Sequence, residues 1–405
     1  MTKTRLIAWT VWMIGSIFYA YQYILRVMPN IMLKDIMQQF NIDAAVFGQF
    51  SGFYYIGYAA IHLPLGIMLD RYGPKNVMPL CILLTVVGLT PILFTDYWVY
   101  PIVGRALIGM GSSAAILGLF KIIRLTFTEE RFTRMLSLSV TIGLVGAIYG
   151  GEPVSYLCDK LGYKAVVELF AMLGLLLAVI TYFIVPNMKK AEQTTTVSHD
   201  IISVLTNKKV IMCCLFAGLM VGPLEGFADV WGSEFLKQVY GLEKSSATSL
   251  PSMIFIGMCF GAPAISFIAE KTGRYLATIV GAGIVMAAGF SALIFWQLTH
   301  NLIVFNFVLI GVCCAYQILA IYQASTYVSE HVAGLTTAIA NMIIMSFGYI
   351  FHTVIGLIVN TNGGPSVSGA LVSGVMFIPI TLAIGAVGFT FLLIQDSVLK
   401  KQSVQ

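Results

Sequence analysis

Four charged side chains lie inside long apolar stretches of the sequence, where a charge is costly unless it has a partner or a function. Arg26 and Arg105 belong to the first half of the chain, and Glu225 and Asp229 to the second. A guanidinium offers a planar pair of donors that suits a carboxylate. Two carboxylates four residues apart share a helix face, where they could share a proton or hold an ammonium group. The structural alternatives are a snorkelling side chain for Arg26, near Pro29, and a gate-closing salt bridge for Asp229.

The polar residues that precede Arg26 have helical spacing. The set consists of Tyr19, Gln22, Tyr23 and Arg26. Its members stand at positions i, i+3, i+4 and i+7, so they lie on one face of a helix. Two phenols, an amide and a guanidinium on one face could line a binding site for a solute that carries a carboxylate.

Three further polar residues are candidates for a transport or binding role. Tyr316 and Gln323 are seven residues apart and share a helix face. They could hydrogen-bond a substrate, although ordinary bonds between helices explain them almost as well. Glu152 follows two glycines, and it could pair with Arg105 or bind a proton.

Two histidines, His62 and His352, also lie in apolar stretches and could titrate. A single histidine in such a stretch more often forms a hydrogen bond to a neighbouring helix, and we favour that interpretation for both. The seven cysteines form no C-x-x-C pair, so neither a disulfide framework nor a metal site is expected. No cofactor is expected.

The apolar stretches predict the elements that hold these residues. The chain is 58% hydrophobic and only 10% charged, whereas a soluble domain carries about 25% charged residues. About 20 apolar residues span a bilayer. Twelve such runs are present, at 7–29, 47–69, 76–95, 98–123, 135–157, 165–186, 209–233, 247–269, 275–297, 301–325, 333–359 and 370–394. The sequence therefore predicts an integral membrane protein, with the first run as a span rather than a cleaved signal peptide.

The longest polar segment divides the twelve runs into two sets of six. We expect an N-terminal bundle at 1–188, a cytoplasmic linker at 189–208 and a C-terminal bundle at 209–405. With the N-terminus inside, 15 of the 23 lysines and arginines fall in cytoplasmic segments and five in external ones. This imbalance predicts that both termini are cytoplasmic.

A short polar motif joins the second and third runs and recurs 200 residues later. Asp70-Arg71 recurs as Glu270-Lys271, with the signs of the charges kept. Gly73 recurs as Gly273, and Ile56-Gly57 recurs as Ile256-Gly257. Self-similarity of this kind indicates two homologous halves, which are typical of transporters.

The stretch from Gly66 to Lys75 reads G-x-x-x-D-R-x-G-x-K, which resembles the loop signature of the major facilitator superfamily. The resemblance implies an all-α membrane protein with twelve transmembrane helices in two pseudo-symmetric six-helix bundles around a central cavity. It implies alternating access, with spans one, four, seven and ten lining the cavity. Asp70 and Arg71 are then expected to take part in gating. The first half is also diffusely similar to the lysosomal dipeptide transporter branch.

Two more motifs bear on the resemblance. Arg105, Gly109 and Gly111 form R-x-x-x-G-x-G, which resembles a fourth-helix motif whose arginine is associated with proton coupling or helix contacts. A glycine series around Gly146 is similar to one linked to antiporters, but Ala147 replaces the proline of that motif. Export is therefore disfavoured.

The sequence thus predicts a secondary transporter for a zwitterion such as an amino acid or dipeptide. Coupling of this transport to protons is one option. The arginines would hold the carboxylate of the solute, and Glu225 its amino group. An organic anion carrier, an exporter of a siderophore or drug, and a non-transporting sensor stay open. No H-E-x-x-H or Walker motif is present, so neither an enzyme nor an ATP-driven pump is expected. We expect a monomer in a bacterial inner membrane, with the lipid bilayer and a small molecule as partners and no nucleic acid.

Overall fold

The computed structural model describes residues 3–187 and 197–402, which form helices without any strand. The chain divides into two compact units, Met1–Thr194 and Thr195–Gln405. The first unit contains α1 (Lys3–Ile31), α2 (Leu33–Phe40), α3 (Ala44–Tyr72), α4 (Pro74–Phe94), α5 (Val99–Thr126), α6 (Glu129–Tyr149), α7 (Glu152–Leu161) and α8 (Tyr163–Ile184). The second contains α9 (Val197–Thr206), α10 (Lys208–Gly218), the π-helix η1 (Gly222–Trp231), α11 (Gly232–Val239), α12 (Lys244–Ser249), α13 (Ser252–Thr272), α14 (Tyr275–Phe295), α15 (His300–Cys314), α16 (Tyr316–Ser325), α17 (Glu330–Thr361), α18 (Ser368–Val375) and α19 (Phe377–Gln402).

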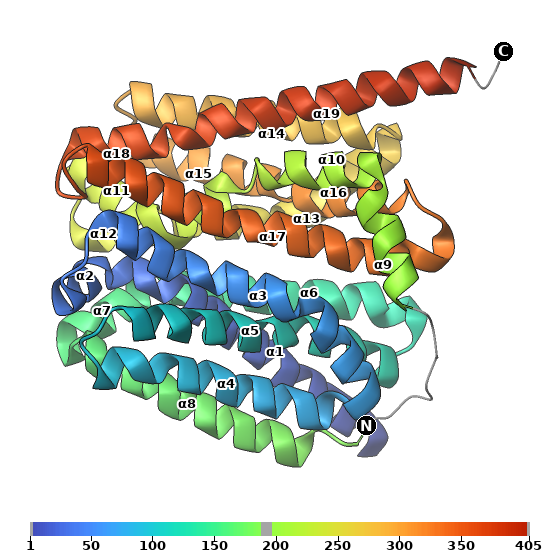
Figure 1. Cartoon of the computed structure of the whole chain (residues 1–405), viewed down its shortest axis with the longest axis horizontal. Helices are drawn as coiled ribbons and strands as arrows, with labels where there is room; N and C mark the ends of the chain where they lie inside the picture. The colour runs from blue at the N-terminus through green and yellow to red at the C-terminus, as the bar shows by residue number, and fades with distance from the viewer. Residues whose placement is uncertain (1–2, 188–196, 403–405) are drawn as a thin grey trace. The chain divides into compact units, whose positions relative to one another are not determined.

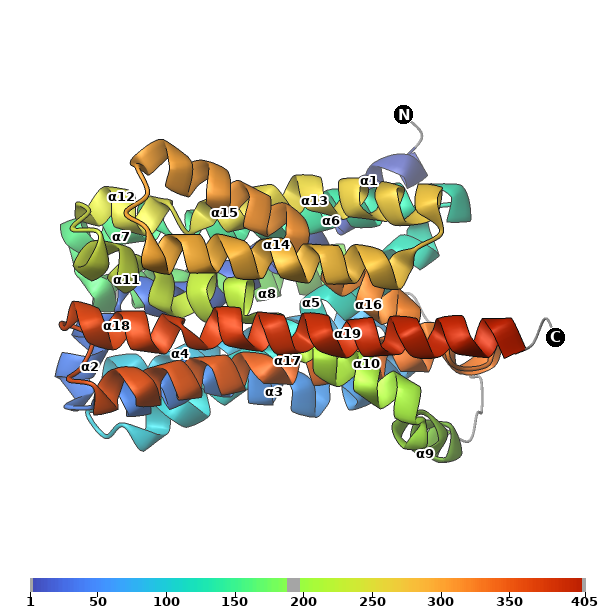
Figure 2. The ribbon, with the colours of Figure 1, turned by 90° about the horizontal axis from the view of Figure 1, so that it is seen from above.

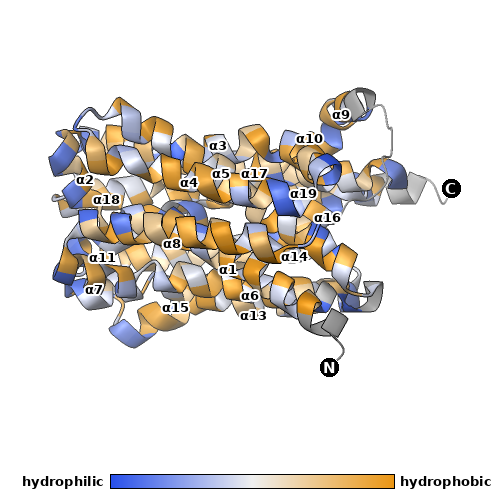
Figure 3. Cartoon of the chain, turned by 90° about the horizontal axis from the view of Figure 1, so that it is seen from below, coloured by the Kyte–Doolittle hydropathy of each residue, from blue (hydrophilic) through white to orange (hydrophobic). Residues whose placement is uncertain are grey.

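Eleven helical segments in the described part of the chain are long and apolar enough to cross a membrane. They coincide with eleven of the twelve predicted runs. Figure 3 shows apolar residues along these helices and more hydrophilic residues on the short helices α2 and α7. The remaining run is α1, whose 29 residues extend about 43 Å at 1.5 Å per residue. Its tyrosines and Gln22 lower its hydropathy. The prediction of an all-α, multi-pass membrane protein is confirmed.

Several spans consist of two or more helices, which the apolar runs did not reveal. The fifth span breaks at Gly150 and Gly151, between α6 and α7. The seventh comprises α10, η1 and α11, and the tenth changes from α15 to α16 at Ala315. Hydrophobicity indicates the length of a span, but it does not indicate where the helix is interrupted.

The two units repeat one pattern of helix packing. In the first unit α3 packs on α5, α4 on α8 and α1 on α6, and in the second α13 packs on α15, α14 on α19 and α10 on α17. Figure 1 shows α4 beside α8, and Figure 2 shows α14 beside α19. The repeated glycines explain the first pair. A Cβ on Gly57 would lie 2.0 Å from the Ala106 carbonyl oxygen, and one on Gly257 would lie 2.1 Å from that of Val308.

The recurring glycine of the loop motif, Gly73 in the first unit and Gly273 in the second, is explained by helix termination. Gly73 ends α3 with φ 77°, and Gly273 ends α13 with φ 65°. Positive φ is strained for residues with a side chain, so glycine is the residue that suits both ends.

The segment between the units is only partly described. Lys189 and Lys190 of the predicted linker lie outside the described residues. Helix α9 occupies 197–206, so part of the predicted linker is helical. Asn207 then caps α10, because its side-chain oxygen accepts from the amide of Lys209 at 3.1 Å and from that of Val210 at 3.3 Å.

Candidate functional site

Arg105 joins three helices of the first unit. It lies in α5 and is 1% exposed. One guanidinium nitrogen donates to the Leu25 carbonyl of α1 at 2.8 Å, and another donates to the Ser51 carbonyl of α3 at 3.4 Å. In a regular helix the Leu25 carbonyl would accept from residue 29, but this is Pro29, which has no N–H. Arg105 supplies the missing donor at a depth where an unsatisfied carbonyl would be costly.

Aromatic rings lie beside the guanidinium groups of Arg26 and Arg105. The guanidinium carbon of Arg105 lies 5.1 Å from the ring centre of Tyr54. That of Arg26 lies 5.1 Å from the ring of Tyr23 and 5.4 Å from the ring of Tyr55. The rings of Tyr54 and Tyr55 meet edge to face, with their centres 5.3 Å apart. A cation over an aromatic face is attracted to it, so the rings stabilise the two positive charges without neutralising them.

The predicted polar face of α1 joins this group. Gln22 accepts a hydrogen bond of 2.6 Å from the Tyr54 hydroxyl. The rings of Tyr19 and Tyr23 lie edge to face, with their centres 5.2 Å apart. We define the arginine–tyrosine cluster as Tyr19, Gln22, Tyr23, Arg26, Tyr54, Tyr55 and Arg105. The structure brings the predicted residues of α1 together, and their role in substrate binding stays a prediction.

His62 continues the aromatic face of α3 beyond the cluster. Its ring stacks on that of Tyr58, with the centres 5.2 Å apart. Its Nδ1 lies 2.8 Å from the Ser113 hydroxyl of α5. This is the hydrogen bond to a neighbouring helix that the sequence favoured.

Glu225 and Asp229 lie in the second unit, on η1 rather than on a regular α-helix. Both are 0% exposed. A π-helix turn inside a span is rare and is often found at a functional site. The backbone carbonyl of Glu225 lies 2.5 Å from Nε2 of His352 on α17. His352 therefore also bonds to a neighbouring helix, and this neighbour carries both carboxylates.

Tyr316 lies beside the start of this segment. Its hydroxyl donates a 2.7 Å hydrogen bond to the Ala217 carbonyl, near the end of α10 at Gly218. The same carbonyl accepts from the Met220 amide at 3.0 Å, so Tyr316 adds a second hydrogen bond at the break in the seventh span. Both Tyr316 and Cys314 are close enough to Glu225 for electrostatic interaction. Glu225 therefore lies near one polar group of α15 and one of α16.

Gln323 does not accompany Tyr316. It lies near the opposite end of α16, where its side chain donates to the hydroxyl of Thr326 at 3.3 Å. Seven residues of helix separate the two by about 10 Å along the axis. The role of Gln323 in substrate binding stays a prediction.

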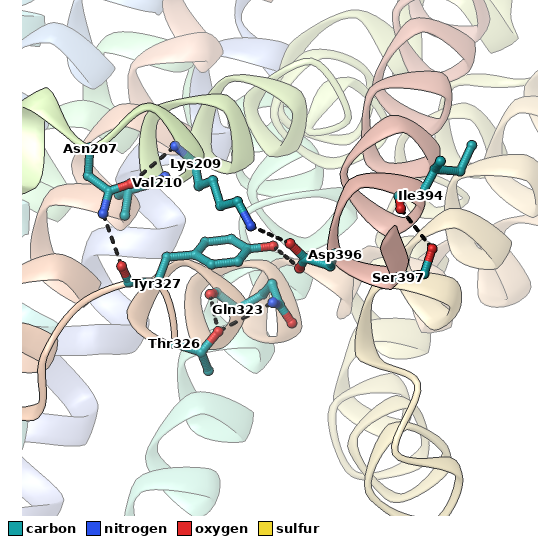
Figure 4. A network of polar contacts seen from close by, with 9 residues as sticks. All are labelled: Asn207, Lys209, Val210, Gln323, Thr326, Tyr327, Ile394, Asp396 and Ser397. Atoms are coloured by element: carbon teal, nitrogen blue, oxygen red, sulfur yellow. Dashed lines mark hydrogen bonds and ion pairs between the residues drawn. The ribbon is translucent and has the colours of Figure 1, made fainter. Parts of the chain in front are cut away.

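Gln323 instead borders a polar network that the sequence reasoning did not identify (Figure 4). Asp396 of α19 accepts from Lys209 of α10 at 2.6 Å and from the Tyr327 hydroxyl at 2.8 Å. Asn207 donates to the Tyr327 carbonyl at 3.0 Å. Burial raises the pKa of the Tyr327 phenol above its ordinary value, and the hydrogen bond to Asp396 adds to this effect. The network ties α10, α19 and the segment between α16 and α17.

The remaining predicted residues lie at helix ends. Asp70, in the last turn of α3, forms an ion pair with Lys121 of α5. The guanidinium carbon of Arg71 lies 5.5 Å from the ring centre of Tyr72. Glu152 is exposed in the first turn of α7, where a negative charge suits the helix dipole. Their roles in gating or coupling stay predictions.

Comparisons with known proteins agree on the fold. A family described as Major Facilitator Superfamily matches residues 12–353. A bacterial homolog of the human lysosomal transporter Spinster, in an inward-facing and unoccupied conformation, has a similar structure, with a TM-score of 0.72 and 16% identity over 96% of this chain and 97% of that one. The nucleoside transporter NupG is similar with a TM-score of 0.77 and 16% identity, over 95% of this chain and 99% of that one. No curated protein matches the sequence significantly. At such identities the structural likeness concerns the fold alone.

Proposed function

Because the chain belongs to the major facilitator superfamily, we propose that it is a secondary active transporter for an amino acid, a dipeptide or a similar zwitterion. Transport proceeds by alternating access, and a proton is the coupling ion. Family and fold are those of multi-pass membrane transporters of small molecules.

The observation that carries the proposal is the pair of fully buried carboxylates on η1. Glu225 and Asp229 lie in a membrane span with 0% exposure. An acidic residue at such depth is expected to serve an ion or substrate pathway. Glu225 supplies the negative charge for a proton or for the amino group of the solute. Asp229, on the same segment, assists in coupling.

Arg26 supplies the charge for the carboxylate of the solute. Its guanidinium lies against two tyrosine rings, and the planar donor geometry of a guanidinium suits a carboxylate. Two guanidinium nitrogens of Arg105 donate to backbone carbonyls. We assign Arg105 and Tyr316 to holding the helices that carry the binding residues, and Tyr19, Gln22 and Tyr23 to the lining around Arg26.

A nucleoside is the second candidate solute. The arginine–tyrosine cluster contains four tyrosines, and aromatic rings can stack on a planar base. One structural neighbour, NupG, is a nucleoside transporter. Neither observation supplies a role for the carboxylates of η1, so the zwitterion takes precedence.

We further propose the placement that the sequence indicated. The protein resides as a monomer in a bacterial inner membrane with both termini cytoplasmic, since 15 of its 23 basic residues fall on one predicted side. Residues 1–188 and 209–405 form the two bundles, and 189–208 forms the cytoplasmic linker.

A thermal-shift screen of the purified protein tests the solute class. Amino acids, dipeptides, organic acids and nucleosides are compared, because a ligand that binds the folded state raises its apparent stability. We expect stabilisation by an amino acid or dipeptide that disappears in both Arg26→Ala and Glu225→Ala. Stabilisation by organic acids that requires only Arg26 would replace the zwitterion by an anion. Stabilisation by nucleosides alone would select the second candidate.

A further inference from the structure

The π-helix that carries both buried carboxylates is held by two consecutive residues of α17. A Cβ on Gly222 would lie 2.6 Å from the Phe351 ring, and one on Gly226 would lie 3.2 Å from the Phe351 Cβ. The Phe351 side chain therefore occupies the space that these two glycines leave open. The next residue, His352, bonds to the Glu225 carbonyl between them.

The chemistry of this bond fixes the protonation of one ring nitrogen. A carbonyl oxygen can only accept a hydrogen bond, so Nε2 of His352 must carry the proton. The donor is then a neutral imidazole N–H or an imidazolium. In either form it bonds to the backbone carbonyl of Glu225.

From this geometry we propose that Phe351 and His352 are positioning residues, which hold η1 in its π-helical form and thereby set how Glu225 binds a proton. The proposal rests on the proposed function in assigning a proton to Glu225. Without the bond and the packed ring, the segment can relax toward the more common α-helix. Because a π-helix and an α-helix place successive side chains at different angles, that change turns Glu225 and Asp229 away from their present surroundings.

The groups around Glu225 show what such a turn would alter. Asp229 lies on the same segment, Cys314 and Tyr316 come from α15 and α16, and His352 comes from α17. Polar and ionisable neighbours determine how readily a buried carboxyl takes up a proton. A rotation of η1 therefore changes the proton affinity of Glu225 with no change to the residue itself.

Labelling with a hydrophobic carbodiimide measures this affinity without any solute. A protonated carboxyl adds its O–H across a C=N bond of the reagent, so the pH dependence of Glu225 labelling reports its protonation. In His352→Leu we expect the midpoint to move by about one pH unit, which is a tenfold change in proton affinity. In His352→Gln, whose amide N–H can still donate, the midpoint stays within about 0.3 unit of the parent.

His62→Leu is the matched control. It also removes a buried histidine that bonds to a neighbouring helix, but its partner is Ser113 of the other unit. Its labelling midpoint should equal that of the parent. If His352→Leu does not fold, Phe351→Leu tests the same packing and should also move the midpoint.

An unchanged midpoint in the folded His352 or Phe351 leucine variant overturns the inference, as does a His352→Gln variant that behaves like His352→Leu. Failure of the proposed function gives a different result. A Glu225→Gln variant that keeps proton-driven uptake refutes coupling through this residue, whatever the labelling shows.

Discussion

Arg105 compensates for the N–H that Pro29 lacks, and this role can be tested by substituting both residues. Arg105→Met keeps an unbranched side chain of similar length but leaves the Leu25 carbonyl without its donor. A hydrogen bond from a charged group contributes about 1.5–3 kcal/mol, and the contact with the Tyr54 ring adds about 0.5–1 kcal/mol. We therefore expect the free energy of unfolding to fall by about 2–4 kcal/mol.

The second step is to restore the helical donor. Pro29→Ala returns an N–H to residue 29, four residues after Leu25, so the carbonyl regains a partner within α1. In this background Arg105→Met should cost about 1 kcal/mol less than in the parent, which is the usual net value of one hydrogen bond. Pro64→Ala is the control, since Pro64 lies in α3 and its absent N–H does not concern Leu25. Its effect should add to that of Arg105→Met.

The assay is a double-mutant cycle from reversible SDS-induced unfolding in mixed micelles, with the four proteins of each cycle at one detergent composition. A coupling free energy of about 1 kcal/mol is expected for the pair with Pro29 and about zero for the pair with Pro64. Equal costs of Arg105→Met with and without Pro29 would refute the reasoning, because the Leu25 carbonyl would then not be the group that Arg105 serves.

Three further predictions concern helix packing and the polar network around Asp396. Gly57→Ala should destabilise the first unit by about 3 kcal/mol through overpacking against Ala106. The control is Gly66→Ala on the same helix, which meets nothing within 4 Å and should be neutral or stabilising. Equal thermal stability of the two variants would contradict the close approach of α3 and α5. Asp396→Ala should cost about 2 kcal/mol of unfolding free energy. The raised pKa of Tyr327 means that its contribution is complete below the ordinary value of 10.0 and is lost as the pH rises beyond it. Tyr327→Phe should lack this alkaline loss in thermal unfolding from pH 8 to 11, and an identical pH dependence in variant and parent would exclude the effect.

The spans and the repeat could be predicted from sequence because their signals are local. Each apolar run is continuous, and the repeated glycines at 57 and 257 stand in the same motif context. The structure explains those glycines by the close approach of two helices in each unit. Membership of the superfamily followed from the same motif, and the family match over residues 12–353 confirms it.

The breaks within spans and the side-chain partners were not predicted, for physical reasons. An apolar span has a similar composition whether its backbone is α-helical or π-helical, so the run 209–233 did not predict η1. The bond between Lys209 and Asp396 joins residues 187 positions apart, and only the packing of α10 near α19 brings them together. One signal was present but not used: Pro29 lies four residues after Leu25, which marks a carbonyl that needs a donor from another helix.

Proton-driven uptake by Glu225→Gln in proteoliposomes tests the central claim most directly. The solute found in the thermal-shift screen is supplied with and without an inward proton gradient, and counterflow exchange is measured on the same vesicles. The proposed coupling predicts that the gradient stimulates uptake by the parent and not by the variant, while exchange continues in both. Equal stimulation of the parent and of Glu225→Gln would contradict proton coupling through the π-helical segment.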